Sequence, residues 1–397
     1  WDARSDALAD LERTFNETGD YGLLPVMGDF WNSWEDLADN PEGIAQRVSV
    51  VEKSKIMTAT INSMDTDLRG QERILDQKVE NTVLQINGLA AQLADLNQKI
   101  ADNEQLGNDA NDLRDRRNHT LEQLAEMIDI NYFEDEMFQV TVLTANGKSL
   151  VQGVQSYELK VDYDRYSGEP LVIWHDDFSA INDSLTGGNL KGHLDSWHDL
   201  QAARDDLREL AAGMIYHVNR LHVQGYGLDG STGNLFFTHA ITVNQGMDNR
   251  GDGVLTFDAS QGINGVDWAN LHDYDDYQIQ LTRDYAGAGD EFKVIDLSTG
   301  EEVAGSEVTI DTSIASQVGI SFRGYHLHID YSAGAPRAGD TFTVSFRDQA
   351  TRTMGVNPVL EDPVKIAAAD NPLELPGNNG TALSIAQLQH QLTMASG

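Results

Sequence analysis

The stretch from Leu75 to Ile100, LDQKVENTVLQINGLAAQLADLNQKI, decides the fold of this chain. Its large apolar residues recur at steps of three and four positions, at Leu75, Val79, Val83, Ile86, Leu89, Leu93, Leu96 and Ile100. Seven steps therefore cover 25 residues, and about 3.6 residues per step is the period of an α-helix. The stretch predicts a helix that buries one face along its whole length.

The same pattern extends toward the N-terminus through Ile44, Val48, Val51, Ile61, Met64 and Leu68. We expect Asn40 to cap the start of this helix and Pro41 to occupy its first position. Gly70 interrupts the stripe and predicts a bend or a change of phase. About 60 residues at 1.5 Å each make a rod of roughly 90 Å. Helices of globular proteins are usually far shorter, so this length favours a coiled-coil-like rod packed against partner helices.

An aromatic segment, DFWNSWEDLADN (29–40), precedes the rod. Asp29 is a suitable N-cap for a short helix, after a break that includes Pro25. We interpret Phe30, Trp31 and Trp34 as packing this short helix against the foot of the rod. Contact with a neighbouring subunit is the alternative for some of these rings.

After the rod, a second helix with an apolar face is expected to run back antiparallel. Residues 131–178 then alternate apolar and polar side chains, and Asn146-Gly147 is a strong hairpin signal. A third long helix follows and is predicted to end at Gly225 and Gly227. Short strand-like runs with Gly-Asp turns dominate from about Thr238 to Arg347.

The predicted fold class is α+β and multidomain. An elongated long-helix bundle with β-hairpins carries an inserted antiparallel β-sandwich or barrel-like domain. Residues 1–238 and 357–397 are assigned to a discontinuous helical rod domain, with the hairpin region around 131–178. Residues 239–356 are assigned to the inserted β-rich domain.

The composition is strongly acidic, with 64 Asp and Glu against 27 Lys and Arg and a net charge of −37. Nucleic acid and anionic membrane surfaces are therefore poor partners, because like charges repel. No apolar run approaches the 18 residues of a membrane-spanning helix. The chain has no cysteine, which excludes disulfides, thiolate catalysis and cysteine-ligated zinc. The acidity fits solubility, a salty habitat or calcium binding.

Four histidines lie on the third long helix, at His193, His198, His217 and His222. His193 and His198 are five residues apart, as are His217 and His222. Five residues are about 140° around a helix, so neither pair converges on a metal ion. We expect these histidines to be solvated or to lie at interfaces.

His326, His328 and Asp330 share one face of a predicted strand. Two imidazoles and a carboxylate could bind zinc or a similar ion. The polar face of a half-buried strand is the alternative.

The stretch DNRGDGVLTFDA (248–259) resembles a calcium loop only through Asp252 and Gly253. Arg250 and Ala259 stand where such a loop needs an oxygen ligand and a bidentate glutamate, so we expect a turn. No nucleophile elbow, zinc-protease motif or phosphate-binding glycine loop is present. The sequence nominates no catalytic, cofactor-binding or metal-binding residue and predicts that the chain is not an enzyme.

Segments distributed in order along the chain resemble the flagellar hook-associated protein 1 family, which forms the hook–filament junction. The match includes the helix, aromatic and Asn-Pro stretches near the start, and the Asn-x-x-His-x-x-Gly-Tyr motif that begins at Asn219. Pro25 departs from the pattern, and residues 241–313 match it poorly. The matching segments are WDARSDALADLERTFNE (1–17), GLLPVMGDFWNSWEDLADNPEGIAQR (22–47), NDLRDRRNHTLEQLAEMIDI (111–130), GGNLKGHLD (187–195), VNRLHVQGYGLDGSTGNLFF (218–237), AGDTFTV (338–344), DPVKIAAA (362–369) and PGNNGTALSIAQLQ (376–389).

The resemblance implies a structural, extracellular role in the bacterial flagellum, joining hook to filament. It implies export through the flagellar type III channel without a cleaved signal. The implied partners are the hook protein, the filament-side junction protein, an export chaperone and other copies of the chain, through paired terminal segments expected to lie outside this sequence. No cofactor is implied.

Two alternatives remain open at this point. The chain could be a related axial protein, either the filament-side junction protein or flagellin. It could also be a secreted acidic adhesin that binds calcium.

Overall fold

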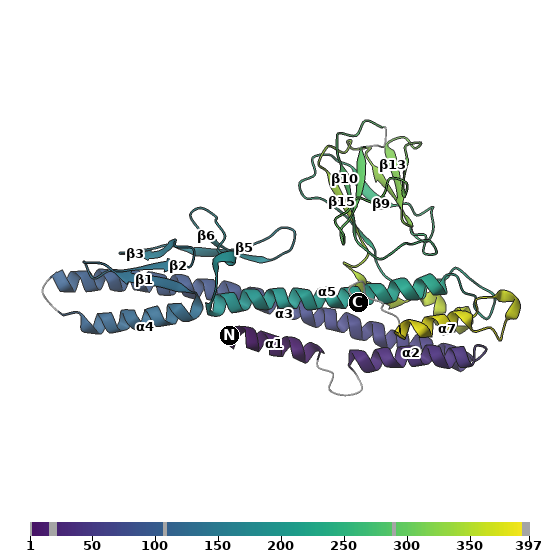
Figure 1. The fold of residues 1–397 in the computed structure, drawn as a ribbon, viewed down its shortest axis with the longest axis horizontal. Coiled ribbons are helices and arrows are strands. Elements are labelled where there is room, and N and C mark those ends of the chain that lie inside the picture. Colours follow the sequence, from purple (N-terminus) through teal and green to yellow (C-terminus); the bar gives the residue numbers. More distant parts are fainter. Residues whose placement is uncertain (1, 16–21, 106–108, 288–290, 391–397) are drawn as a thin grey trace. The chain divides into compact units, whose positions relative to one another are not determined.

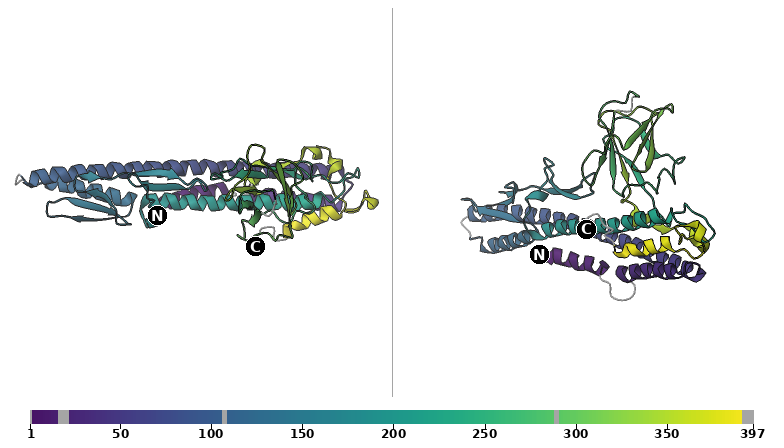
Figure 2. Two further views of the ribbon diagram at one scale, coloured as in Figure 1. Left: turned by 90° about the horizontal axis from the view of Figure 1, so that it is seen from above. Right: turned by 45° about the vertical axis from the view of Figure 1, so that its right-hand side comes forward.

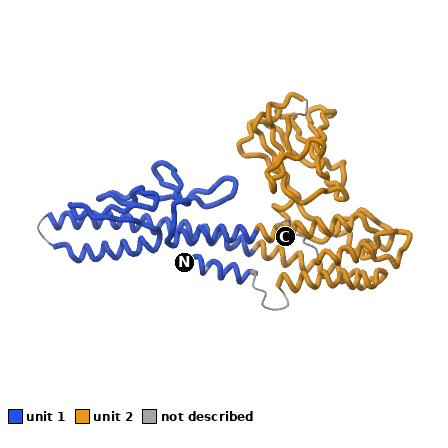
Figure 3. Tube along the Cα trace, viewed as in Figure 1, with its two compact units in different colours: residues 1–16, 67–204 blue, residues 17–66, 205–397 orange. Residues whose placement is uncertain are grey.

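The computed structural model describes residues 2–15, 22–105, 109–287 and 291–390 (Figures 1 and 2). The chain divides into two compact units, residues 1–16 with 67–204 and residues 17–66 with 205–397 (Figure 3). The long helices α3 (Ile44–Gln105) and α5 (Gly188–His222) contribute to both units. This division differs from the predicted one, whose boundaries at 238/239 and 356/357 stay a prediction.

Helices form one side of the first unit. They are α1 (Asp2–Phe15), the second half of α3, α4 (Asn111–Met127) and the first half of α5. Arg4 of α1 donates two hydrogen bonds to Asp199 of α5, at 2.9 and 3.0 Å. Gln71 of α3 donates to the hydroxyl of Thr14 at 2.6 Å, so α1 is bonded to both long helices.

The predicted apolar stripe forms the core of this unit. Its residues from Leu75 to Ile100 are buried, apart from Leu89, which is half-buried. Several of them pack with the inner face of α4 and with the strands in one hydrophobic cluster. Helix α3 runs through Gly70 without interruption, so the break in the apolar pattern at this residue does not end the helix.

Two antiparallel sheets complete the first unit. One has the order β1-β2-β3-β4 and the other pairs β5 with β6. The Asn146-Gly147 hairpin joins β2 to β3, with Gly147 in the left-handed region at φ +81°, as the sequence predicted. The strands are β1 (Ile130–Glu134), β2 (Val140–Thr144), β3 (Ser149–Gln152), β4 (Gln155–Ser156), β5 (Leu159–Tyr163) and β6 (Pro170–Trp174).

Two asparagines of α3 bond these sheets to the helix. Asn87 exchanges two hydrogen bonds with the backbone of Leu159, at 2.8 and 2.9 Å. Asn97 does the same with Val140 and also donates to the carbonyl of Gly153. Because each amide bonds backbone groups of one strand position, these contacts fix the strands against one register of the helix.

In the second unit, α2 (Leu23–Asp39) and α7 (Gly380–Gln387) pack against each other. The predictions for the start of this unit were wrong at Pro25, Asp29, Asn40 and Pro41. Helix α2 already begins at Leu23, so Asp29 lies inside it, and Pro41 lies in the turn before α3. Pro25 lies inside the first turn of α2, where a helix loses nothing by its missing N–H. Asn40 ends α2, with its backbone N–H donating to Asp36, and α3 begins only at Ile44.

The predicted stripe was also wrong at Ile44 and Val48, which are about half exposed. At this end of α3 the buried face is centred on Arg47, Val50 and Ser54 instead. At 100° per residue, Val48 points well away from that face. Arg47 therefore occupies a core position of α3 where a hydrophobic pattern predicts an aliphatic residue.

The inserted β region is an antiparallel sandwich of two four-stranded sheets, beside α5 in Figure 1. One sheet has the order β11-β10-β15-β8 and the other β12-β13-β14-β9. Buried and half-buried residues alternate along the central strands. The ring centroid of Tyr277 lies 5.1 Å from that of Phe322 in the facing sheet. The strands are β8 (Thr242–Gln245), β9 (Val254–Phe257), β10 (Tyr277–Leu281), β11 (Phe292–Asp296), β12 (Val308–Asp311), β13 (Gln317–Phe322), β14 (Tyr325–Asp330) and β15 (Thr341–Ser345).

A two-residue pairing lies where the chain passes into and out of this insert. Strand β7 (Phe237–Thr238) pairs antiparallel with β16 (Gly355–Val356). The remaining short elements are η1 (Asn182–Ser184), α6 (Ala350–Thr353), η2 (Pro358–Glu361), η3 (Pro363–Lys365), η4 (Pro372–Glu374) and η5 (Leu388–His390).

Candidate functional site

The end of helix α5 organises the part of the second unit from which the insert departs. We call Asn219, His222, Tyr226, Phe236 and Phe237 the α5 junction. Asn219 and His222 lie one turn apart on the last two turns of the helix. The other three follow the helix end, on a segment that folds back along it.

Asn219 is fully buried and bonds the returning segment through its side-chain amide. Its Oδ1 accepts from the backbone N–H groups of Phe236 and Phe237, at 2.9 and 2.7 Å. Its Nδ2 donates to the carbonyl of Phe237 at 2.9 Å. A side chain with only a donor or only an acceptor could not satisfy these three groups.

His222 is also buried and bridges two other segments. Its Nδ1 lies 2.7 Å from the carbonyl of Asn234, and its Nε2 lies 2.9 Å from the backbone nitrogen of Ala367. A carbonyl can only accept and a backbone N–H can only donate, so the proton of the neutral ring sits on Nδ1. Burial lowers the pKa of His222 to about 4, and the nearby Arg47 acts in the same direction.

Residues 363–369 are threaded between the helices at this point. The backbone N–H of Tyr226 donates to the carbonyl of Ala369 at 2.8 Å, and the hydroxyl of Thr381 donates to the same carbonyl. A Cβ on Gly225 would come within 2.6 Å of the Thr381 hydroxyl. Glycine is therefore required there by close packing rather than by backbone angles.

Arg47 completes the enclosure from the start of α3. Only 1% of it is exposed, and its guanidinium donates to the carbonyls of Pro41 and Ile366. Burial lowers the pKa of Arg47 to about 10, although the carboxylate of Asp229 opposes this. The arginine thus bonds the N-terminal foot of the rod to the segment that runs back from the insert.

An aromatic cluster fills the space between these polar contacts. Trp34 is fully buried and lies with its ring centroid 5.1 Å from Phe236 and 6.4 Å from Phe30. Phe236 in turn contacts Phe237 at 4.8 Å and His222 at 5.3 Å. Phe30, Trp31 and Trp34 are core residues, since at most 5% of each is exposed. Outside α2, the ring partners of Phe30 and Trp34 lie at the α5 junction, whereas the prediction placed them on the foot of the rod.

Ion pairs and tyrosine hydroxyls connect the insert to α5. Glu209 of α5 accepts from Arg347 and from the hydroxyl of Tyr274, each at 3.0 Å. Tyr216, one turn before Asn219, donates to the carbonyl of His272 at 2.7 Å. Burial raises the pKa of Asp276, and the nearby Arg347 opposes that rise.

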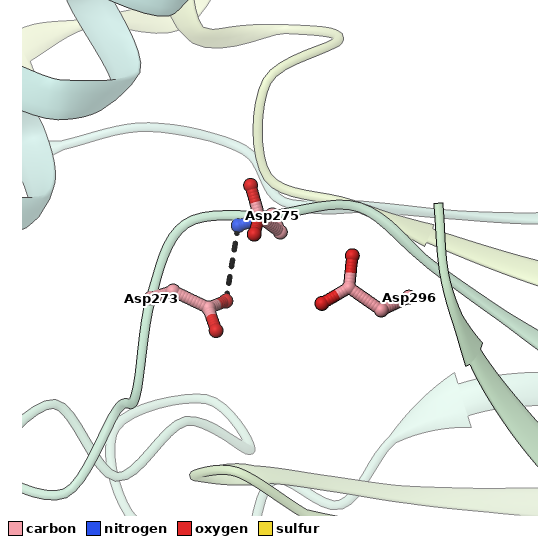
Figure 4. A group of neighbouring side chains, drawn as sticks. All are labelled: Asp273, Asp275 and Asp296. Atoms are coloured by element: carbon pink, nitrogen blue, oxygen red, sulfur yellow. Dashed lines mark hydrogen bonds between the residues drawn. The ribbon is translucent and has the colours of Figure 1, made fainter. Parts of the chain in front are cut away.

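A carboxylate cluster lies further inside the insert, at Asp273, Asp275 and Asp296 (Figure 4). Within the described ranges this is the group of acidic side chains that could hold a metal ion, with oxygens within 4.8 Å of one another. However, Arg323 already donates to Asp296 at 3.0 Å and lies 3.5 Å from Asp273. The arrangement is an internal ion-pair network, so it does not favour a calcium-binding function.

The histidines of α5 have different surroundings. His198 is exposed, as predicted, and its Nε2 lies 3.1 Å from Glu169. His193 is half-buried, and burial lowers its pKa. His217 contacts the rings of Tyr216 and Tyr274. The expectation was wrong for His222, whose backbone partners lie on segments that follow α5 and take the place of water.

His326, His328 and Asp330 occupy one half-exposed face of β14, as predicted. His328 lies 2.9 Å from the hydroxyl of Thr256, and His326 lies 2.9 Å from that of Ser321. Asp330 accepts from the backbone of Ser332. The structure gives these residues neighbours on the adjacent strands rather than bringing their ligand atoms together.

The calcium-like stretch around Asp252 lies in the loop between β8 and β9. Its backbone N–H groups at Arg250 and Gly251 donate to Asp340, which is almost fully buried. Asp252 therefore belongs to a connection between strands. Ala259 follows β9 and offers no side-chain ligand.

Sequence reasoning missed the roles of Asn219, Arg47, Arg323 and Arg347. The three arginines bond to Ile366, Asp296 and Glu209, which lie 319, 27 and 138 positions away from Arg47, Arg323 and Arg347, so no local pattern identifies their roles. The three-residue spacing of Asn219 and His222 was a usable signal, because it places two polar side chains on one face of an otherwise apolar helix.

No helix within the described ranges is both long enough and apolar enough to cross a membrane. Residues 8–237, more than half of the chain, match a family model described as the flagellar hook-associated protein FlgK helical domain. Flagellar hook-associated protein 1 of Bacillus subtilis is 28% identical over 264 residues, covering 60% of this chain and 52% of that protein. The Escherichia coli protein of the same name is 25% identical over 393 residues, covering 96% and 67%.

A solved structure of the flagellar hook junction protein FlgK from Burkholderia pseudomallei matches with a TM-score of 0.64. It is 21% identical and covers 92% of this chain and 64% of that one, which shows a shared fold. The chain spans about half the length of the Bacillus subtilis and Salmonella typhimurium relatives it matches.

Proposed function

Because the chain belongs to the family of the flagellar hook-associated protein FlgK helical domain, we propose that it joins the hook to the filament as a structural subunit of the bacterial flagellum. The family match over residues 8–237 is the observation that carries this proposal. It favours this function over flagellin, a filament-side junction protein or a calcium-binding adhesin.

The geometry of the second unit supports a mechanical role. A junction subunit has to transmit bending and torque without local unfolding. At the α5 junction, α3, α5 and α7 are held to residues 363–369 by buried hydrogen bonds, and α2 packs Trp34 against Phe236. Buried polar groups bonded in this way favour one arrangement of the segments over alternatives.

The proposed location and partners follow from the same membership. Proteins of this family are parts of the external flagellum, and we place the chain at the hook–filament junction after export through the flagellar channel. Its proposed partners are the hook protein, the filament-side junction protein, an export chaperone and further copies of itself. We propose no catalytic activity.

Cryo-microscopy of intact flagella from cells that carry the full-length protein tests this function. The β-sandwich gives each subunit a recognisable projection, so averaged images should show it in a short zone between hook and filament. Density repeated along the whole filament would instead indicate a flagellin. A deletion strain that still assembles filaments on its hooks would contradict the proposal.

A further inference from the structure

A cavity of about 250 Å³ lies where the chain passes from the α5 junction into the insert. One wall is the segment that leads into β8, and the other is formed by the end of β9 and the residues after it. Its apolar lining comes from Leu235, Ile241, Phe257, Ile263, Val266 and Trp268. Drug-sized ligands occupy pockets of roughly 300–1,000 Å³, so this one suits a ligand of about a single ring.

His239 supplies an imidazole to this lining. The ring of Phe346 lies at a centroid distance of 4.3 Å from the imidazole, tilted by 48°, and that of Trp268 lies 5.9 Å away. Both ring nitrogens are buried, yet neither has a hydrogen-bond partner among the described residues. A buried polar atom without a partner weakens the native state. The ring has to turn about its Cβ–Cγ bond to present a nitrogen to the cavity, and a ligand bonded to that nitrogen would recover part of the lost free energy.

The lining of the cavity also contains no charged side chain among the described residues. None of the described residues that line it is Asp, Glu, Lys or Arg, although such residues make up 23% of the chain. Burial lowers the pKa of His239 to about 3, so the ring is neutral at physiological pH, with one donor and one acceptor nitrogen. Ions and metal complexes are therefore disfavoured, and a neutral ligand is favoured.

We propose that this cavity is a binding site for a phenolic group, whose ring packs against Trp268 and Phe257 and whose hydroxyl bonds to His239. An aromatic ring matches the aromatic lining, and a hydroxyl can donate to or accept from an imidazole nitrogen. The phenol is either a small molecule or the tyrosine side chain of a second copy of the chain.

Binding of p-cresol, the side-chain analogue of tyrosine, tests this directly on the purified protein. We expect saturable binding by calorimetry, with toluene at least about tenfold weaker because it lacks the hydroxyl. The nitrogen resonances of His239 should shift with p-cresol and not with toluene. Equal affinities, or the absence of saturable p-cresol binding, would overturn the proposal, as would a crystal soaked in p-cresol that shows only water in the cavity.

A His239→Phe variant isolates the role of the ring nitrogens. It retains an aromatic ring, so toluene should still bind, and the preference for p-cresol over toluene should fall to about one. The matched control is His119→Phe, at an exposed position of α4, which should keep the full preference. A His239→Phe protein that still prefers p-cresol tenfold would contradict the assignment.

Sedimentation of the protein with and without p-cresol separates the two sources of the phenol. If a tyrosine of a second copy occupies the cavity, p-cresol should dissociate the self-associated species. If the ligand is a small phenol, the association state should stay the same while calorimetry still reports binding.

Discussion

The α5 junction and the face between α3 and α5 in the first unit differ in how their buried polar groups are bonded. In the second unit, the side-chain polar atoms of Asn219 and His222 all bond to backbone groups. In the first unit, α3 meets α5 where Glu72 accepts from Arg204, and the next acidic residue on that face is Asp76. Asp76 Oδ1 and His193 Nδ1 are buried there with no hydrogen-bond partner in the described ranges.

The difference separates a specified region from a tolerant one. Hydrogen-bonded polar groups in a core determine which segments pack together. Removing one member of a hydrogen-bonded pair leaves the other buried without a partner. Unpartnered groups weaken the native state without specifying it. We therefore expect substitutions at the α5 junction to lower the free energy of unfolding. We expect substitutions that remove unpartnered polar groups from the α3–α5 face of the first unit to raise it.

The two regions should also respond to pH in opposite directions. Burial and the neighbouring Glu72 and Glu80 raise the pKa of Asp76 to about 6. Between pH 4 and 6 the folded state then binds more protons than the unfolded state, so this site weakens folding as pH rises. His222, with its pKa lowered to about 4, weakens folding as pH falls from about 6.5 to 4.

The largest effect should follow from removing the centre of the aromatic cluster. We expect Trp34→Ala to lower the free energy of unfolding of the second unit by about 3–5 kcal/mol, because it leaves a large cavity. Urea unfolding followed by circular dichroism measures this. Leu24→Ala, at a side chain of α2 that is 72% exposed, is the control and should change stability by less than about 0.5 kcal/mol. An unchanged urea midpoint of unfolding in Trp34→Ala would contradict the packing role of Trp34.

Loss of the Asn219 amide should come next. Asn219→Leu leaves two backbone N–H groups and one carbonyl buried without partners, and we expect a loss of about 3 kcal/mol. Amide exchange at Phe236 and Phe237 should accelerate most. Asn32→Leu, at an exposed position of α2, is the matched control. If exchange at Phe236 stays slow in Asn219→Leu, the junction does not depend on this residue.

The pH dependence of the junction should be smaller. Lowering the pH from 7 to 4 should cost the wild type about 2 kcal/mol more than it costs His222→Gln, which keeps a donor and an acceptor but does not titrate. Unfolding curves at both pH values in both proteins give this difference. Parallel losses in the two proteins would show that His222 is not the group that titrates.

The smallest effect should be a gain in the first unit. Asp76→Asn should stabilise the protein by about 1 kcal/mol at pH 7.5, less than the full pKa shift implies because the carboxylate is partly solvated. At pH 4 the gain should nearly vanish, since Asp76 is then protonated in the folded state. Thermal melting at the two pH values checks this, and a stabilisation independent of pH would point to helix propensity instead.

The elements with strong local signals could be predicted from the sequence. The stripe from Leu75 to Ile100 and the Asn146-Gly147 hairpin depend on neighbouring residues, and both are confirmed. Helix ends were less predictable, because Pro25 fits either a break or the first turn of a helix and Asn40 fits either the start or the end of a helix. The α5 junction could not be derived, since His222 and its partner Ala367 are 145 positions apart.

The pairing of β7 with β16 makes the insert a replaceable cassette. Its two strands place Phe237-Thr238 beside Gly355-Val356, so the chain leaves the helical part and rejoins it at neighbouring points. A foreign domain whose own ends lie close together could be spliced there without stretching either connection.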